Sequence, residues 1–354
     1  MSIIIAILIF AIIILVHEIG HFSAARLFNM RVISFNLGMG PTLLKKRGKE
    51  TVYQLKAIPF GGSCQLGEDI EETDDPRDFR NKPVWQRAIV IVAGAVLNLV
   101  LGFVLCLIIV GTSERIDTTE IRFFPEGAIS NQQLQIGDKI THVNGMRIFT
   151  WVDISYQFVN TEMRMAEDED IAFFEFTVIR NGERMQLENV PFLTRVNEES
   201  KREVVFDFGR VWEDKMFFNV ISRAAGEAFS LSRLIIITLF DLIRGTYGLN
   251  EIAGPVGVVS AIGEVSGAGF SRSFLEGIQN SLFMAALISI NVGIFNLLPI
   301  PALDGGRLVF FGIEAIRREP VKAEVEGMIH WIGFGALMLF MLLITVLDIG
   351  KLFS

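Results

Sequence analysis

The sequence predicts a polytopic α-helical membrane protein with about four transmembrane helices and one inserted, mainly β, extramembrane domain. Of its 354 residues, 51% are hydrophobic and 20% are charged. Several apolar stretches reach the roughly 20 residues that a helix needs to cross a bilayer core of about 30 Å. A long polar segment with strand-like alternation separates the second stretch from the third. These features favour a membrane protein over a purely soluble one.

Four stretches are apolar enough to span a membrane. They are expected at about Ser2–Arg26, Val84–Val110, Phe274–Leu298 and Met328–Leu347. The first stretch has neither a basic start nor a small-x-small cleavage site. We therefore expect it to be retained as an anchor and not removed as a signal peptide.

The polar segment at 112–210 predicts one extramembrane globular domain. Its apolar and polar positions alternate, as in β-strands with one buried face. Asn144-Gly145 and Asn181-Gly182 are turn signals of the kind that join two antiparallel strands. The domain is therefore expected to be mainly β.

The stretch at 217–246 has apolar residues at helical spacing. Four charged side chains interrupt it: Arg223, Arg233, Asp241 and Arg244. This pattern favours a helix at the membrane interface over a fifth span. The glycine-rich "IGEVSGAG" at 262–269 predicts a connector.

The predicted organisation has four parts. They are a membrane domain at 1–111 with a reentrant loop at 31–83 on the cytoplasmic side, the β domain at 112–210, the interfacial helix and connector at 211–272, and a second membrane part at 273–354.

Charge and cysteine content argue against two kinds of site. The net charge is −8 and no basic stripe with interleaved aromatic side chains is present, so no nucleic-acid partner is expected. Cys64 and Cys106 are far apart in unlike surroundings. They predict neither a disulfide framework nor a CxxC metal site.

The short loops indicate an orientation. Basic residues gather after the first span and after the third. They are Arg26, Arg31, Lys45, Lys46, Arg47 and Lys49 in the first loop, and Arg307, Arg317, Arg318 and Lys322 in the second. The positive-inside rule then places both loops in the cytoplasm and both termini and the 112–210 domain outside.

The first span contains an H-E-x-x-H pattern, His17-Glu18-Ile19-Gly20-His21. Histidines four residues apart lie on one helix face, so both imidazoles can reach one metal ion, and Glu18 can act as a general base. Ionisable groups near a bilayer centre cost a few kcal/mol each. Because mere packing of two histidines offsets no such cost for the neighbouring glutamate, the pattern predicts a metal site.

A catalytic zinc site needs a third protein ligand and an open position. The third span ends in "NLLPIPALDGG", where Pro299 and Pro301 break the helix before Asp304. Irregular backbone at membrane depth is tolerated where it lines protein or a wet cavity. Asp304 is either a turn residue at the membrane edge or an oxygen ligand. Two neutral imidazoles, one carboxylate, Zn²⁺ and hydroxide sum to zero charge, which favours the ligand interpretation.

Four motifs together carry a family resemblance. They are "HEIGH" at 17–21, "FNLGMGP" at 35–41, "IPFGG" at 58–62 and "NLLPIPALDGG" at 296–306. The chain resembles the site-2 protease family of intramembrane zinc metalloproteases, and within it the bacterial regulator-of-sigma-E-protease type. The resemblance covers essentially the whole chain.

The resemblance implies roles for individual residues. His17, His21 and Asp304 would bind zinc, and Glu18 would activate water for peptide hydrolysis. Asn296 would hold the substrate backbone or the developing oxyanion, with Pro299 and Pro301 in the same substrate-binding segment; helix packing is the alternative role for Asn296.

One segment departs from the family pattern. The family often has Ala-Gly-Pro ahead of an asparagine in the second span, whereas this chain has Ala93-Gly94-Ala95 ahead of Asn98. The missing proline weakens a substrate-gating role for Asn98.

The polar domain resembles one PDZ domain, on the stretch at 123–145. A PDZ fold accepts an extended chain as an added strand, and the alternative is a domain that only blocks access. "VYQLKAIPFGG" at 52–62 is expected to offer a similar strand edge within the membrane, because a helical substrate hides its peptide bonds.

The resemblance implies a zinc endopeptidase of the bacterial cytoplasmic membrane, with its active site toward the cytoplasmic side and its PDZ domain extracytoplasmic. Expected partners are membrane lipids and single-pass membrane substrates, such as anti-sigma factors or remnant signal peptides, after an upstream site-1-type protease has cut. A non-catalytic client-binding membrane protein is the alternative, but binding alone needs no general base such as Glu18. A metal transporter would instead have ligands along several spans.

Overall fold

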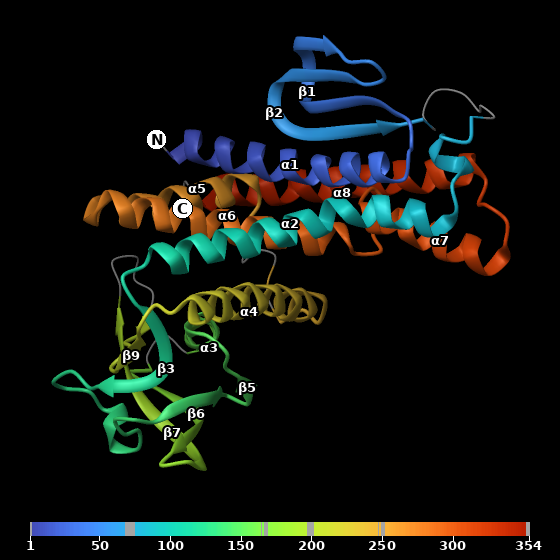
Figure 1. Cartoon of the computed structure of the whole chain (residues 1–354). Coiled ribbons are helices and arrows are strands. Elements are labelled where there is room, and N and C mark those ends of the chain that lie inside the picture. Colours follow the sequence, from blue (N-terminus) through green and yellow to red (C-terminus); the bar gives the residue numbers. More distant parts are fainter. Residues whose placement is uncertain are drawn as a thin grey trace. The chain divides into compact units, whose positions relative to one another are not determined.

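The computed structural model describes residues 2–67, 75–163, 165, 169–196, 202–246, 248 and 252–351. Figure 1 labels most of the helices and strands. The chain divides into two compact units, one of Met1–Leu105 with Ile235–Ser354 and the other of Cys106–Leu234. We describe each unit by itself.

Four helices among the described residues are long and apolar enough to cross a membrane. They are α1 (Ser2–Leu27), α2 (Val84–Thr112), α6 (Phe274–Asn296) and α8 (Ala323–Lys351). They confirm the four predicted spans. Exposed apolar side chains such as Leu339 and Leu342 on α8 suit a helix whose surroundings are hydrocarbon.

The predicted connector at 262–269 is wrong, because these residues lie inside α5 (Pro255–Arg272). Small residues allow this helix to pack closely: a side chain at Gly269 would meet the Asn280 amide and the Glu276 carbonyl at 2.7 Å. Ile262 is fully buried in a cluster with α1 and α6 side chains. Gly269 therefore serves close helix packing, and the glycines of this stretch do not break the helix.

A β-hairpin follows α1 in the first unit. Its strands are β1 (Val32–Arg47) and β2 (Val52–Leu66), which pair antiparallel. Both strands bend, so that Phe35 pairs with Tyr53 on one side and with Cys64 on the other. The segment from Gly62 to Leu66 therefore forms an edge of the sheet, since its partners among the described residues are all in β1.

Two shorter elements complete the first unit. The 3-10 helix η1 (Phe79–Asn81) precedes α2. Helix α7 (Asp304–Arg317) follows the turn after α6. The fully buried Phe79 ring contacts Phe311 of α7, with ring centroids 6.1 Å apart.

The second unit contains a seven-stranded sheet in the order β8-β7-β6-β4-β3-β9, with β5 paired to β4. Its elements are β3 (Ile116–Phe123), η2 (Ser130–Gln132), β4 (Lys139–Val143), β5 (Met146–Arg147), α3 (Trp151–Glu162), β6 (Ile171–Arg180), β7 (Glu183–Val196), β8 (Arg202–Val204) and β9 (Gly209–Glu213). Asn144-Gly145 and Asn181-Gly182 have the positive φ angles of hairpin turns. The sheet confirms the predicted β-rich region.

The helix predicted at 217–246 forms as α4 (Phe217–Ile243), and its location at the membrane interface stays a prediction. Its residues up to Leu234 belong to the compact second unit, so that unit extends beyond the predicted limits of 112 and 210. Asp153 of α3 explains the extension. Its carboxylate accepts hydrogen bonds from the Ser230 hydroxyl at 2.9 Å and the Arg233 guanidinium at 2.7 Å.

Candidate functional site

The predicted H-E-x-x-H residues lie together on α1. His17 and His21 are one helical turn apart, and their Nε2 atoms are 3.0 Å from each other. Their side chains are 12% and 10% exposed. Both donor atoms therefore point to one place, as the helical spacing predicts.

Asp304 brings a carboxylate to the same place from a distant part of the chain. It is the first residue of α7, after the prolines of the preceding turn. Its Oδ2 lies 3.1 Å from His17 Nε2 and 3.3 Å from His21 Nε2. The structure thus joins the three residues predicted as ligands.

The chemistry of this donor set fits a metal ion. Ligand atoms bonded to zinc at about 2.0–2.1 Å in a tetrahedron lie about 3.3–3.5 Å apart, close to the spacing of the three donors. Asp304 Oδ2 is buried with no hydrogen-bond donor among the described residues. His21 donates its Nδ1 hydrogen to the Val90 carbonyl at 2.9 Å, which leaves a lone pair on Nε2.

Asn98 of α2 lies behind His17, a placement that the sequence analysis missed. The Asn98 amide nitrogen is 3.4 Å from His17 Nδ1, and its buried Oδ1 has no partner among the described residues. Turning the amide by half a turn would let Oδ1 accept the Nδ1 hydrogen of a His17 that binds metal through Nε2. Asn98 is therefore placed to orient His17.

Gly94 of α2 lies directly against both histidines. A Cβ there would overlap His21 Nε2 and lie 2.8 Å from His17 Cε1. This glycine belongs to the Ala93-Gly94-Ala95 segment, which lies inside the continuous helix α2. Its function at this point is to make room for the imidazoles.

Glu18 faces the edge of the hairpin. It is 8% exposed and accepts a hydrogen bond from the Cys64 backbone. A Cβ at Gly62 would lie 2.7 Å from Glu18 Cγ and 3.0 Å from its Oε1. The edge segment Gly62–Leu66 therefore runs beside the candidate general base.

Cys64 does not add a thiolate to this site. Burial, followed by the nearby charge of Glu18, raises the pKa of its thiol to about 12. Only the thiolate binds metals or attacks carbonyls, so Cys64 remains a neutral neighbour.

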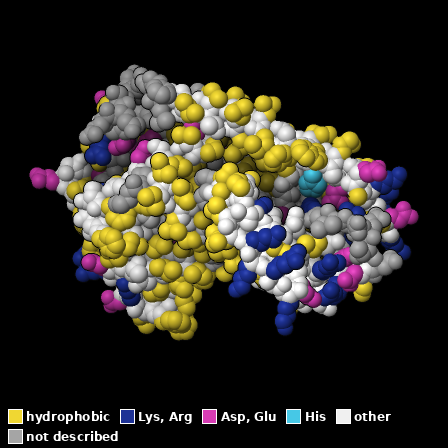
Figure 2. All heavy atoms as spheres, turned by 90° about the horizontal axis from the view of Figure 1, so that it is seen from above, with side chains coloured by type: hydrophobic (Ala, Val, Ile, Leu, Met, Phe, Trp, Pro, Cys, Tyr) yellow, Lys and Arg dark blue, Asp and Glu magenta, His cyan; other side chains and the backbone are white. Residues whose placement is uncertain are grey.

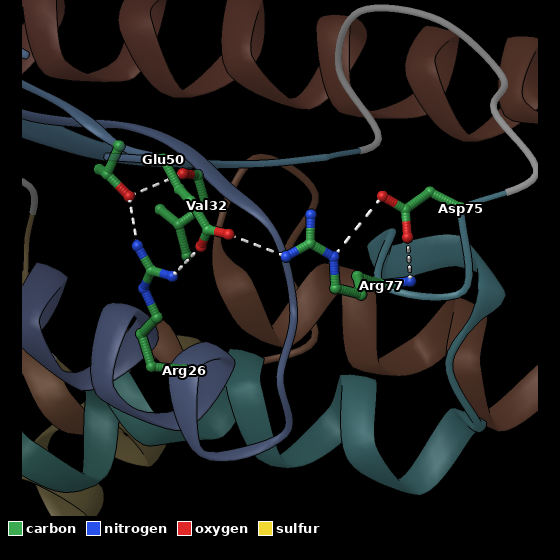
Figure 3. A network of polar contacts seen from close by, with 6 residues as sticks. Arg26, Val32, Glu50, Asp75 and Arg77 are labelled. Carbon is green, nitrogen blue, oxygen red and sulfur yellow. Dashed lines mark hydrogen bonds and ion pairs between the residues drawn. The ribbon is translucent and has the colours of Figure 1, made fainter. Parts of the chain in front are cut away.

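An ion-pair network joins the turn between β1 and β2 to the end of α1 (Figure 3). Glu50 accepts from Arg26 at 2.7 Å and from Arg77 at 2.9 Å. Arg26 also donates to the Thr51 hydroxyl at 2.7 Å, and this hydroxyl donates to the Val32 carbonyl at 2.8 Å. The network ties the hairpin to the helix that carries the histidines.

The predicted substrate-binding residues lie along the turn that leads to Asp304. Asn296 is the last residue of α6 and is half-buried, while Pro299 is exposed. Pro301 contacts α8, where a Cβ at Gly333 would lie 2.8 Å from its carbonyl oxygen. Their substrate-binding role stays a prediction.

Comparisons with known proteins cover almost the whole chain. A family model described as peptidase family M50 matches residues 5–340. The zinc metalloprotease RasP of Geobacillus kaustophilus is 30% identical over 436 residues, which cover 99% of this chain and 98% of that protein. The regulator of sigma-W protease RasP of Bacillus subtilis is 28% identical over 432 residues, which cover 98% of each.

Proposed function

Because the chain belongs to peptidase family M50, we propose that it is an intramembrane zinc endopeptidase that cuts within or near transmembrane segments of single-pass membrane proteins. The convergence of the donor atoms of His17, His21 and Asp304 is the observation that carries this proposal. These residues are the zinc ligands in it. When bound, zinc supplies Lewis-acid chemistry that polarises a carbonyl and lowers the pKa of water.

Glu18 is the general base in this proposal. Its carboxylate takes a proton from the attacking water and returns it to the leaving amine nitrogen. The peptide C–N bond breaks after the new C–O bond has formed. Its position next to His17 on α1, largely shielded from solvent, supports this role.

The hairpin edge is the proposed place for the unwound substrate. An extended chain that pairs with Gly62–Leu66 would satisfy its backbone groups and lie beside Glu18. Asn296, Pro299 and Pro301 would contact the substrate from the turn that precedes Asp304. The edge position of β2 and its contact with Glu18 support this arrangement.

Localisation and substrates follow from the same proposal. We place the protein in the bacterial cytoplasmic membrane, with the active site toward the cytoplasm. The second unit (Cys106–Leu234), called the β unit below, is an extracytoplasmic PDZ domain in this proposal. Figure 2 shows Lys and Arg side chains gathered toward one end of a face that is otherwise rich in hydrophobic side chains, which is consistent with a membrane orientation. Anti-sigma factors, first cut by a site-1-type protease, are the proposed substrates because one relative is named as a regulator of sigma-W.

The donor pattern gives no support to a metal transporter. Within the described residues, His17, His21 and Asp304 are the one group of three or more candidate ligands found close together. A transport path would need further groups along the spans. A client-binding protein without hydrolysis does not account for Glu18 at the site.

Two substitutions test the site. We expect Glu18→Gln to keep zinc, because no ligand is lost, but to lower cleavage of a single-span reporter in detergent by about 10²–10⁴-fold. Asp304→Ala should lower both cleavage and zinc content, because a ligand is lost. Zinc by elemental analysis and cleavage by gel assay are the measurements.

Glu319 is exposed, so Glu319→Gln serves as the matched control and should retain both zinc and cleavage. Cleavage by Glu18→Gln at the wild-type rate would remove Glu18 from the mechanism. Unchanged zinc in Asp304→Ala would remove Asp304 from the ligand set.

A further inference from the structure

The turn that delivers Asp304 contains a strained alanine. Ala302 has a φ of +80°, a conformation that glycine adopts freely and that residues with a side chain rarely adopt. Such residues persist where the surrounding structure holds them, and they concentrate at functional sites. Ala302 lies two residues before Asp304, so its conformation sets the direction in which the chain enters α7.

His330 of α8 holds Ala302 in this conformation. The Ala302 N–H donates to His330 Nδ1 at 3.0 Å. Because Nδ1 accepts this hydrogen bond, the neutral ring has its own hydrogen on Nε2, which lies 4.0 Å from Glu326 Oε1. The ring also contacts Phe310 of α7, with centroids 5.7 Å apart. His330 therefore touches both the turn and the helix that Asp304 begins.

The next turn of α8 approaches the same segment closely. A Cβ at Gly333 would overlap the Pro301 side chain and lie 2.8 Å from the Pro301 carbonyl oxygen. Ala302 and His330 also border a cavity of about 1230 Å³. Because part of their surroundings is hollow, packing there does little to replace the hydrogen bond that His330 provides.

We infer that His330 is a positioning residue for the metal site. It holds the strained backbone at Ala302 so that the Asp304 carboxylate meets the imidazoles of His17 and His21. The inference rests on the proposed function, because it takes Asp304 to be a zinc ligand. His330 itself touches neither the three donor atoms nor, in this proposal, the substrate.

The test compares metal binding in three His330 variants of the full-length protein in detergent. His330→Asn puts an acceptor oxygen where Nδ1 was, His330→Gln puts it one bond farther out, and His330→Ala removes it. Loss of an outer partner typically costs 10–100-fold in metal affinity. We expect that loss in the Ala variant, a loss nearly as large in the Gln variant, and near wild-type affinity in the Asn variant.

A second substitution separates positioning from simple packing. Ala302→Gly removes the conformational strain, so the turn no longer needs the hydrogen bond. We expect Ala302→Gly to recover most of the zinc affinity that His330→Ala loses, although it restores no contact of the ring. Zinc titration and the absorption spectrum of the cobalt-substituted protein report ligand geometry independently of cleavage.

Two control substitutions accompany the His330 variants. Trp331→Ala removes a large, 75% exposed side chain next to His330 on α8 and should leave zinc affinity unchanged. Asp304→Ala tests the proposed ligand directly. If it retains zinc, the proposed site fails, whatever the His330 variants do.

The inference alone is overturned if Asp304→Ala loses zinc while His330→Ala binds it as tightly as wild type. It is also overturned if Ala302→Gly restores no zinc affinity to His330→Ala and if His330→Asn binds zinc as weakly as His330→Ala. If His330→Ala does not fold, His330→Asn and His330→Gln are compared instead. Equal zinc affinities in these two variants would overturn the inference.

Discussion

At the scale of single residues, the absence of a side chain matters as much as the donors do. Gly94 of α2 leaves the space that the two imidazoles occupy. Gly62 similarly lets the hairpin edge reach Glu18. Interiors are packed so closely that one added methyl group is felt. Both positions are therefore part of the site although neither provides a functional group.

Gly94→Ala should disturb the ligands directly. The added Cβ overlaps His21 and must push the imidazoles or α2 aside, which typically costs about 1–3 kcal/mol. If this cost falls on the metal-bound geometry, we expect zinc affinity to fall about 5- to 150-fold, measured by competition with a chromophoric chelator. Gly111 lies on the same helix, and a Cβ there would meet no described atom within 4 Å beyond its own stretch of helix, so Gly111→Ala is the matched control. Equal affinities in the two variants would contradict this account of Gly94.

At the scale of elements, α4 shows how one carboxylate anchors a helix. Asp153 caps α3 by accepting from the Phe149 and Thr150 backbone N–H groups at 2.7 and 3.0 Å. The same fully buried side chain accepts from Ser230 and Arg233 of α4. The amphipathic pattern of α4 predicts a helix but cannot reveal that Arg233 pairs with a carboxylate of another helix.

Asp153→Ala should destabilise the β unit. Removing one partner from a buried ion pair leaves the other charge uncompensated and typically costs about 3–5 kcal/mol; the lost cap adds to this. Chemical unfolding followed by tryptophan fluorescence measures the loss, since Trp151 and Trp212 lie in this unit.

Asp170→Ala is the control for this prediction. It breaks an ion pair with Arg202 in which the Asp170 side chain is 85% exposed. Such pairs are worth about 0–1 kcal/mol. If both variants unfold at the same denaturant concentration, Asp153 is not an anchor.

At the scale of the whole molecule, the candidate site joins three segments that are far apart in the chain. Donors come from α1 and α7, and Asn98 supports them from α2. The Ser289 hydroxyl of α6 donates to the Asn98 carbonyl at 2.8 Å and ties a fourth helix to this arrangement. A metal bound here would cross-link α1 and α7 and stabilise the folded state.

Removal of metal should therefore lower the thermal unfolding temperature in detergent. A ligand present at 100 times its dissociation constant stabilises the folded state by about 2.7 kcal/mol. Chelation should lower the midpoint of the wild-type protein but shift that of Asp304→Ala little. Scanning calorimetry with and without chelator measures the difference, and identical wild-type midpoints would argue against a bound metal.

Features with a short-range signature were predictable from the sequence. The four spans follow from about 20 consecutive apolar residues, and the hairpins from Asn-Gly pairs. The pairing of His17 and His21 follows from helical period. By contrast, glycines in α5 have the same local signature whether they break a helix or allow close packing, and the predicted connector was wrong for that reason.

Which residues can bind a metal and which segments can enter a membrane could be predicted from the amino-acid sequence, because both depend on side-chain chemistry and on neighbours along the chain. That Asp304 meets the histidines, that Gly94 makes room for them and that His330 holds the turn became clear only in the folded chain. These contacts join residues that are distant in sequence, and they depend on how helices pack, which no local pattern encodes.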